Sequence, residues 1–350
     1  MAVFSMRDFA AHEQVVFCHD ANAGLSAIIA IHSTKAGPAL GGCRMWPYAS
    51  EEAALADVLR LSRGMTYKAA MAGLGFGGGK SVIIGDPRRD KSERLFLALA
   101  RSVERLGGRY IVAEDAGTSV ADMEIVRRGT RYVAGIAEGG SGDPSPATAW
   151  GVLHGLRAAV RRRLGADSLG GLTVAVQGLG HVGWILCEHL AREGARLVVS
   201  DIDEARVRRA ALEFHADAVA PAAIFDVPAD AFAPCALGAV LNDETVRRLA
   251  APVVAGSANN PLARPEHGRA LAGRGILYAP DYVINAGGII NIAHEGPNYD
   301  RERAMAHVTK IHDTLAELFA YAEAERLPTS EAADRLAEAR LNAPTPRKAA

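Results

Sequence analysis

Two lysines and one aspartate have the types and spacing for acid–base chemistry. Lys68 and Lys80 lie twelve residues apart in one glycine-rich segment, and Asp115 follows the strand-like run Tyr110–Ala113. Two ammonium groups in one cleft disfavour each other's charge, and burial adds to that effect. One lysine can then hold a substrate carboxylate while the other loses its proton and acts as a general base. The same residues also fit two solvated lysines on a loop, and Asp115 also fits the N-cap of a helix that begins after Ser119.

A phosphate-binding P-loop does not explain the lysine segment. The motif GxxxxGK[ST] requires glycine at position 74, where this chain has Leu74. A P-loop also leads from a strand into a helix, whereas Ser81–Ile84 reads as a strand. The lysines are therefore better candidates for acid–base catalysis than for ATP binding.

A second glycine-rich motif predicts a dinucleotide site. The strand-like run Leu172–Gln177 leads into a GxGxxG sequence and a helix follows. Its residues, all predicted to contact the cofactor, are Gly178, Leu179, Gly180, His181, Val182 and Gly183. The glycines allow the backbone to approach a pyrophosphate, which the helix N-terminus also attracts. The alternatives are a chance glycine turn and, for His181, an ordinary residue of the first helical turn.

Asp201 indicates which dinucleotide this motif binds. It lies 18 residues after Gly183, at the end of the next strand-like run, Arg196–Ser200. At that place a carboxylate accepts a hydrogen bond from the ribose 2′-hydroxyl and repels a 2′-phosphate. The sequence therefore predicts NAD in preference to NADP.

The elements that must position these residues belong to an α/β chain of two domains. At 350 residues the chain is long enough for two, and a cluster of glycine and proline at 139–146 predicts the boundary. We expect an N-terminal α/β domain at 1–142 and a Rossmann doubly wound parallel sheet at 143–325. Residues 326–350 should form a C-terminal helix and a loose tail from about 342. The expected strands are Ala27–His32, Ser81–Ile84, Tyr110–Ala113, Leu172–Gln177 and Arg196–Ser200. Further strand-like runs end at Gly238 and Ser257, and a last one is Tyr282–Asn285.

Composition excludes several classes of protein. The net charge is −1, with no basic surplus for nucleic acid. No apolar run is long enough for a membrane helix, and the N-terminus does not read as a signal peptide. The four cysteines form no CxxC pair and the eleven histidines do not cluster, so we expect reduced thiols, a cytoplasmic protein and no metal site.

Seven ordered segments resemble the leucine/phenylalanine/valine dehydrogenase family, within the amino-acid dehydrogenase superfamily that includes glutamate dehydrogenase. Leucine and valine dehydrogenases are the most similar in appearance. The segments are 37–42, 66–81, 114–118, 178–183, 234–238, 255–260 and 279–288, and the similarity extends over nearly the whole chain. The chain departs from the family's common residues at Lys35–Ala36, Cys43 and His294, which lie near the substrate pocket or its rim.

The resemblance implies reversible NAD-dependent oxidative deamination of an L-amino acid to the 2-oxo acid and ammonia. Lys68 matches the lysine that binds the α-carboxylate, Lys80 the catalytic lysine that activates water, and Asp115 the aspartate that assists proton transfer. Asn259 and Asn260 match asparagines near the substrate and the nicotinamide. Thr148 falls where a side chain can reach the nicotinamide amide.

The resemblance also implies a side-chain pocket and a division of labour between the domains. The pocket residues are Leu40, Gly41, Ala113, Ile289 and Ile292. Apolar branched side chains favour leucine, valine or isoleucine, since a charged substrate side chain would be desolvated without a partner. Residues 1–142 would bind substrate and make subunit contacts in a dimer or octamer, 143–325 would bind NAD, and the last helices would return toward the first domain.

Other functions are also compatible with parts of the sequence. A phenylalanine dehydrogenase of the same family would keep the same catalytic residues. A non-catalytic dinucleotide sensor would have no use for the two lysines and the aspartate together. A 2-hydroxy-acid dehydrogenase typically uses histidine with arginine or a carboxylate, and no such group occurs near the lysines. The preferred amino acid, the oligomeric state, the physiological direction and any regulation are not fixed by the sequence.

Overall fold

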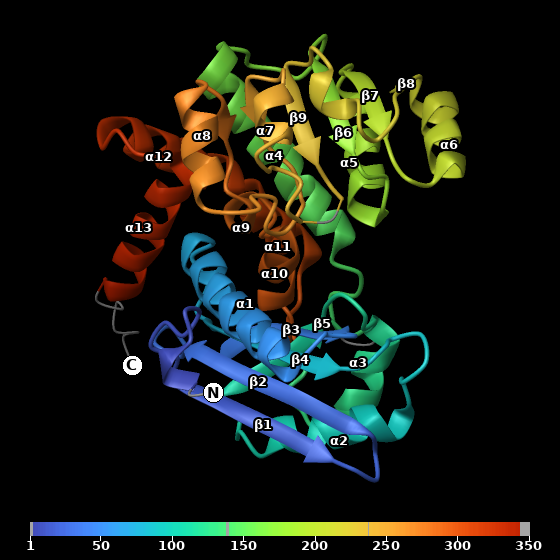
Figure 1. Cartoon of the computed structure of the whole chain (residues 1–350), viewed down its shortest axis with the longest axis vertical. Helices are drawn as coiled ribbons and strands as arrows, with labels where there is room; N and C mark the ends of the chain where they lie inside the picture. Colours follow the sequence, from blue (N-terminus) through green and yellow to red (C-terminus); the bar gives the residue numbers. More distant parts are fainter. Residues whose placement is uncertain (1–2, 138–139, 237, 344–350) are drawn as a thin grey trace. The chain divides into compact units, whose positions relative to one another are not determined.

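The computed structural model describes residues 3–137, 140–236 and 238–343, and its contacts divide the chain into two compact units (Figure 1). Unit 1 contains Met1–Asp143, Ile292–Asp300 and the chain end from Ala337. Unit 2 contains Pro144–Asn291 and Arg301–Leu336. The expected second domain ran without interruption from 143 to 325, whereas contacts place 292–300 with unit 1. Part of the predicted boundary cluster and most of the predicted tail lie outside the described residues.

Unit 1 is built on a mixed five-stranded sheet in the order β1-β2-β4-β3-β5. β1 pairs with β2 and β2 with β4 in antiparallel fashion, while β3 lies parallel to both β4 and β5. The strands are β1 (Gln14–Asp20), β2 (Leu25–Ser33), β3 (Ala39–Trp46), β4 (Gly77–Ile84) and β5 (Tyr110–Glu114). Because β3 and β5 are parallel neighbours, residues that follow their carboxyl ends meet at one edge of the sheet.

Serine caps begin each long helix of unit 1. The Ser50, Ser92 and Ser119 hydroxyls accept hydrogen bonds from backbone N–H groups three residues ahead. The helices are α1 (Glu51–Met71), α2 (Glu93–Glu104) and α3 (Val120–Arg127), after a short 3-10 turn, η1 (Val3–Ser5). Since Ser119 caps α3, Asp115 remains available for another role.

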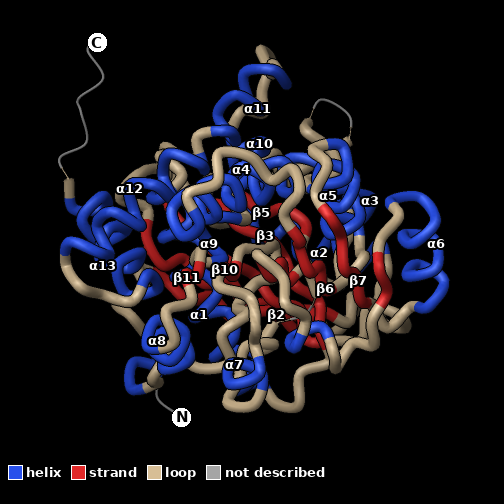
Figure 2. Tube along the Cα trace, turned by 90° about the horizontal axis from the view of Figure 1, so that it is seen from above, coloured by secondary structure: helices blue, strands red, loops and turns tan. Residues whose placement is uncertain are grey.

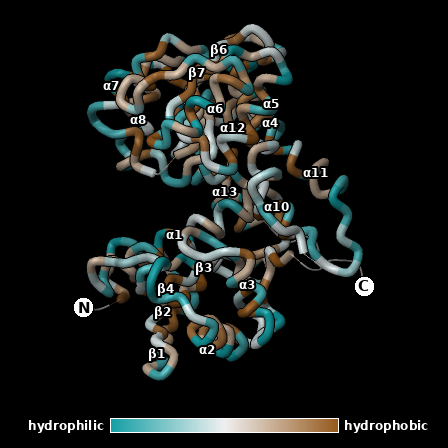
Figure 3. The backbone as a smooth tube through the Cα atoms, turned by 90° about the vertical axis from the view of Figure 1, so that its right-hand side faces the viewer, coloured by the Kyte–Doolittle hydropathy of each residue, from teal (hydrophilic) through white to brown (hydrophobic). Residues whose placement is uncertain are grey.

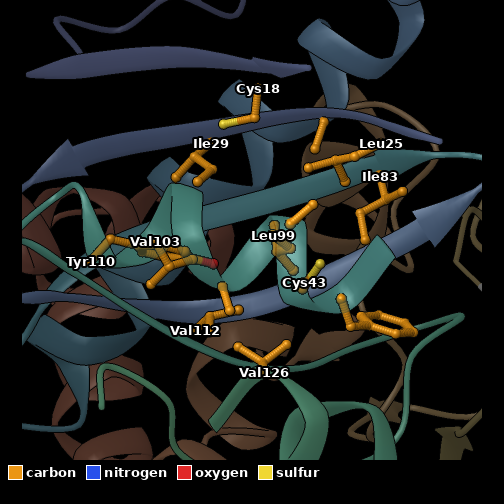
Figure 4. Packing of buried hydrophobic residues seen from close by; sticks show 14 of the residues in the cluster. Cys18, Leu25, Ile29, Cys43, Ile83, Leu99, Val103, Tyr110, Val112 and Val126 are labelled. Atoms are coloured by element: carbon orange, nitrogen blue, oxygen red, sulfur yellow. The ribbon is translucent and has the colours of Figure 1, made fainter. Parts of the chain in front are cut away.

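Helices cover both faces of this sheet. On one face, α1 packs Val58 and Leu59 against Ile28, Ala30 and Val82. On the other face, α2 and α3 enclose a larger cluster, whose packing Figure 4 shows around Ile29, Leu99, Val112 and Val126, among others. The strand alternation of β2 and β4 therefore places even-numbered residues, Lys80 included, on the face covered by α1.

Glycines allow α1 and the strands to approach closely. A Cβ on Gly78 would lie 2.0 Å from the backbone nitrogen of Thr66 in α1. A Cβ on Gly41 would lie 1.8 Å from the Gly79 carbonyl oxygen. Such distances exclude any larger residue without movement of the backbone. The glycine-rich stretch before Lys80 is thus part of a strand under a helix, and the alternative of two lysines on a solvated loop is wrong for Lys80.

Unit 2 contains a parallel six-stranded sheet in the order β11-β10-β9-β6-β7-β8. Counted within this unit the order is 3-2-1-4-5-6, that of a Rossmann fold. The strands are β6 (Thr173–Gln177), β7 (Arg196–Ser200), β8 (Asp217–Ala218), β9 (Ala231–Pro234), β10 (Val253–Val254) and β11 (Leu277–Tyr278). The chain is therefore an α/β protein with a doubly wound parallel sheet in its second half, as predicted.

The helices of unit 2 surround this sheet. Helix α6 packs against β7 and β8. Figure 2 shows α6 on the β7 side of the sheet, and Figure 3 shows apolar stretches of chain running through the interior of the unit. The helical elements are α4 (Ser145–Leu164), α5 (His181–Arg192), α6 (Glu204–Phe214), η2 (Ile224–Asp226), α7 (Thr245–Arg248), α8 (Glu266–Gly273), α9 (Asp281–Ile284), α11 (Arg301–Thr309) and α12 (Ile311–Ala324). Two further helices, α10 (Gly287–Ala293) and α13 (Thr329–Asn342), are divided between the units.

One predicted strand is wrong. Tyr282–Asn285 lies in the helical turn α9 and just after it, where the Asn285 N–H donates to the Asp281 carbonyl. Pro280 precedes this turn, and its fixed φ and missing N–H suit the start of a helix. A run of three apolar residues, Tyr282–Ile284, does not by itself distinguish a buried strand from a buried helical turn.

Candidate active site

Lys80 and Asp115 form a buried ion pair in unit 1. The Lys80 Nζ lies 3.0 Å from the Asp115 Oδ2, and the Lys80 side chain is only 5% exposed. Asp115 follows the carboxyl end of β5, beside β3, as expected from the parallel pairing. The Thr118 hydroxyl also accepts a hydrogen bond from the Asp115 backbone N–H, which fixes the turn after the strand. The structure therefore brings together the two residues predicted to carry the chemistry.

Arg44 is a second cation on the same carboxylate. Its Nε donates to Asp115 Oδ2 at 2.9 Å, and its Nη1 lies 3.0 Å from Asp57 Oδ2. Asp57 is held in turn by the Tyr48 hydroxyl at 2.7 Å and by Arg60 at 2.8 Å. Sequence reasoning missed this network, because Arg44 and Asp57 belong to no catalytic motif and only the fold joins them to Asp115.

The charges in this network determine the state of Asp115. Burial alone would raise the pKa of the Asp115 carboxyl, but Lys80 and then Arg44 outweigh burial and hold that pKa below its ordinary value. Asp115 is therefore an anion at neutral pH. Both cations contact Oδ2, and Oδ1 accepts no hydrogen bond from any described residue. With 19% of the side chain exposed, Asp115 keeps an acceptor available for a ligand.

Lys68 lies in the last turn of α1, half-buried. The turn around it is tied down by the end of α13 within unit 1. The Tyr67 hydroxyl donates to Glu338 at 2.7 Å, and the Arg340 Nη1 donates to the Met71 carbonyl at 2.6 Å. Helix α1 packs on Gly78 through Thr66, and Lys68 lies two residues further along the same helix. Lys68 is therefore on the helix that covers the sheet carrying Lys80.

Four of the five predicted pocket residues lie in unit 1. Leu40 and Ala113 are buried, at 2% and 4% exposure, on the adjacent strands β3 and β5. A Cβ placed on Gly135 would lie 3.6 Å from Ile292 Cδ1 and 3.9 Å from Ala113 Cβ, so Ile292 and Ala113 adjoin around this glycine. Both carboxylate oxygens of Glu295 accept from the Gly135 N–H and fix it there. Gly41 serves strand packing, as described above, and Gly135 was not foreseen.

The glycine loop of unit 2 has the geometry of an anion site. Gly178 has a φ of +96°, and a Cβ on it would lie only 2.8 Å from the Ala236 nitrogen. A Cβ on Gly183 would lie 2.0 Å from the Gly178 carbonyl oxygen. Gly180 is the N-cap of α5, with no side-chain cap and open space around its Cβ position. The first N–H groups of α5 are therefore accessible to a phosphate.

Asp201 lies beside this loop. Its Oδ2 accepts from the Leu179 N–H and its Oδ1 from the Asp203 N–H, at 2.5 and 2.8 Å. Gln177 and Ser200, at the carboxyl ends of β6 and β7, each have a buried side-chain oxygen with no hydrogen-bond partner among the described residues. Open helix N–H groups, uncommitted polar atoms and a carboxylate at the next strand fit a dinucleotide.

Three other predicted residues of unit 2, Asn259, Asn260 and Thr148, each make a polar contact within that unit. The Asn285 side chain donates to Asn259 Oδ1 at 2.8 Å, and the Asn260 N–H donates to Asp281. The Thr148 hydroxyl donates to the Pro144 carbonyl and would lie 3.0 Å from a Cβ on Gly288, immediately before Ile289. Asn285 Oδ1 is buried without a partner among the described residues, which makes this amide a further candidate that the sequence did not single out.

Two kinds of feature are absent from the described residues. No group of three or more His, Cys, Asp or Glu side chains is placed to hold a metal ion there. No helix among the same residues is long and apolar enough to cross a membrane.

A Rossmann sheet with an open glycine loop, next in sequence to a unit with a buried lysine–aspartate pair, defines a dinucleotide-binding α/β protein. Family models extend this. Residues 12–132 match the dimerisation domain of Glu/Leu/Phe/Val dehydrogenases, and residues 139–205 and 201–340 match the Glutamate/Leucine/Phenylalanine/Valine dehydrogenase model. The chain belongs to the glutamate/leucine/phenylalanine/valine dehydrogenase family.

Individual relatives agree with this assignment. The chain is 56% identical over 343 residues to leucine dehydrogenase from Thermoactinomyces intermedius, covering 97% of this chain and 94% of that protein. It is 52% identical over 346 residues to valine dehydrogenase from Streptomyces coelicolor, covering 97% and 95%. The crystal structure of L-tryptophan dehydrogenase from Nostoc punctiforme matches with a TM-score of 0.83 and 46% identity, covering 95% of this chain and 96% of that one. The predicted family is confirmed.

Proposed function

We propose that this protein catalyses the reversible oxidative deamination of a small branched-chain L-amino acid. The amino acid, water and NAD⁺ give the 2-oxo acid, ammonium, NADH and a proton. The observation that carries this proposal is the buried Lys80–Asp115 pair, with one free carboxylate oxygen, on the sheet face covered by the helix that bears Lys68. A dinucleotide sensor without catalysis would have no use for these three residues together.

Each of the three residues has a separate task in this reaction. Lys68 binds the α-carboxylate as a fixed cation. Asp115 accepts a hydrogen bond from the substrate amine through Oδ1, which no described residue occupies. Neutral Lys80 takes a proton from the water that attacks the imino carbon and passes it through Asp115 to the amino nitrogen. It then takes the hydroxyl proton of the carbinolamine as ammonia leaves. Because Lys80 and Asp115 are in contact, a proton has a short path between the amine and the base.

The glycine loop of unit 2 holds the cofactor. When bound, a nicotinamide dinucleotide accepts the hydride from Cα. The α5 N-terminus would bind its pyrophosphate, and Asp201 its adenosine ribose. Because a carboxylate repels a 2′-phosphate, we propose NAD in preference to NADP. Thr148, Asn259 and Asn260 would orient the nicotinamide and the substrate.

The pocket residues support an aliphatic substrate. Leu40, Ala113, Ile289 and Ile292 are all apolar, and none of them could pair with the carboxylate of a glutamate side chain. Leucine, valine and isoleucine differ by single methylene or methyl groups, each worth about 1–3 kcal/mol in an apolar pocket. We therefore expect overlapping activity on all three.

The assembly and location follow from the same family resemblance. We propose a homo-oligomer built through the first unit, which matches a dimerisation domain over residues 12–132. We propose a cytoplasmic enzyme, since all four cysteines are free thiols. Neither nucleic acid nor a membrane is expected as a partner.

The test is NADH formation by purified protein with NAD⁺ and each of leucine, valine, isoleucine, phenylalanine and glutamate. The proposal expects the highest kcat/KM on one of the three branched aliphatic substrates. A preference for phenylalanine would keep the chemistry and overturn the reading of Ile289 and Ile292. Absence of NADH with all five would overturn the proposed function, and repetition with NADP⁺ would separate a wrong cofactor from a wrong reaction.

A further inference from the structure

The two cations on Asp115 are chemically different. Lys80 can lose its proton in the catalytic cycle, whereas a guanidinium stays charged at any pH the protein survives. Whenever Lys80 is neutral, Arg44 is the remaining cation in contact with Asp115 Oδ2, at 2.9 Å. Without Arg44, a buried carboxylate would then lose its charge partner in the middle of the reaction, at a large energetic cost.

We propose that Arg44 is a positioning residue that holds Asp115 ionised and in place while Lys80 exchanges its proton. This inference rests on the proposed function. Arg44 is suited to the task because its guanidinium bridges two carboxylates, Asp115 through Nε and Asp57 through Nη1. Asp57 is itself fixed by the Tyr48 hydroxyl, so the orientation of Arg44 is determined from both sides.

Charge in this network acts on the catalytic base as well as on Asp115. Arg44 and Lys80 contact the same carboxylate oxygen, so their two positive charges repel each other at short range. Asp57, on the far side of Arg44, has the opposite effect at a greater distance. Removal of Arg44 and removal of Asp57 should therefore move the pH dependence of kcat in opposite directions.

Four other titratable groups around this part of the sheet, on one face or the other, do not titrate in the relevant range. Burial raises the pKa of Cys43 to about 12 and keeps the pKa of Tyr110 and Tyr48 above the ordinary tyrosine value. His32, in β2, has its pKa lowered by burial to about 4. All four are therefore neutral between about pH 6 and 9. Lys68 at the end of α1, Glu114 at the end of β5 and Asp122 in α3 are the further ionisable groups on the surrounding elements.

The experiment is the pH profile of kcat for Arg44→Met and Asp57→Asn, at saturating leucine and NAD⁺. The profile is repeated with leucine deuterated at Cα, because the isotope effect on kcat reports how far hydride transfer limits the rate. For Arg44→Met we expect a loss of kcat of about 10- to 100-fold and a move of the low-pH limb upward by about one pH unit. For Asp57→Asn we expect a smaller loss and a move of a few tenths of a unit to lower pH.

Two further variants separate positioning from structure. Arg44→Lys keeps the charge but cannot bridge both carboxylates, so the limb should stay near its wild-type position while kcat remains reduced. Arg101→Met removes an arginine from the surface pair with Asp20 and should change neither kcat nor the low-pH limb.

The same low-pH limb in Arg44→Met, Asp57→Asn and wild type would overturn the proposal, even with reduced kcat. A purely structural role changes the amount of active enzyme and not its pH dependence. If Arg44→Met does not fold, Asp57→Asn alone decides. An inactive wild type would instead contradict the proposed function.

Discussion

Replacing Lys80 by alanine should remove catalysis while leaving the protein folded. A positioned general base contributes about 10²- to 10⁴-fold to a rate. Lys80 serves two proton-transfer steps, so we expect kcat to fall by about 10³- to 10⁴-fold, or about 4–5.5 kcal/mol of barrier. Its 5% side-chain exposure leaves little room for water to replace it.

The same structure limits the cost in stability. Removing one member of a buried ion pair usually costs about 3–5 kcal/mol because the other charge is left without a partner. Here Asp115 keeps Arg44 at 2.9 Å. We therefore expect a smaller loss in the free energy of unfolding, about 1–3 kcal/mol, most of it from the lost packing of the lysine stem.

The assay measures NADH formation at saturating leucine and NAD⁺, with NADH binding followed by fluorescence to report on unit 2. Lys91→Ala is a matched control, since Lys91 also pairs with a largely buried aspartate, Asp122, but has no role in the mechanism. The control should keep kcat within about twofold of wild type. A Lys80→Ala enzyme within tenfold of wild-type kcat would refute the assignment of Lys80 as the base.

Two further predictions concern the cofactor and the pH dependence of stability. Asp201→Ser removes the carboxylate that repels a 2′-phosphate, so the ratio of kcat/KM with NADP⁺ to that with NAD⁺ should rise about 10- to 100-fold, and an unchanged ratio would contradict the role of Asp201. Burial, followed by the charges of His12 and Arg63, lowers the pKa of His32 from 6.5 to about 4, so the folded state resists protonation. The stability contribution of His32 is complete above pH 6.5 and is lost as the pH falls toward 4, by up to about 2 kcal/mol at pH 5. Urea unfolding at pH 7 and 5 should therefore show a smaller difference for His32→Gln than for wild type, and equal differences would count against this reasoning.

Local patterns in the sequence were sufficient for much of the second unit. The glycine loop, the strand before it and Asp201 after the next strand are joined by short connections, so their order along the chain fixes their arrangement. Strands β6 and β7 begin within one residue of the predicted bounds or at them. The strand predicted at Tyr282–Asn285 was wrong because its three apolar residues are too few to show a period.

Unit 1 was harder to predict because its sheet depends on pairing between distant segments. Strand β3 is rich in glycine and shows no alternation, and β1 is a half-exposed edge strand with weak apolar patterning. Lys80 and Asp115 could be chosen by residue type and family resemblance. Arg44 could not, since it lies 71 residues from Asp115 and only the register of β3 with β5 brings them together.

The end of α13 has a consequence for how truncated genes are interpreted. Glu338 and Arg340 hold the turn that carries Lys68, yet both lie about fifty residues beyond the last recognisable motif, which ends at Gly288. A reading frame interrupted near codon 336 would still encode every residue by which an amino-acid dehydrogenase is identified. Its product would lack Glu338 and Arg340, which contact the Tyr67 hydroxyl and the Met71 carbonyl. An inventory of motifs would therefore count the gene as intact, although the turn that carries Lys68 has lost these two contacts.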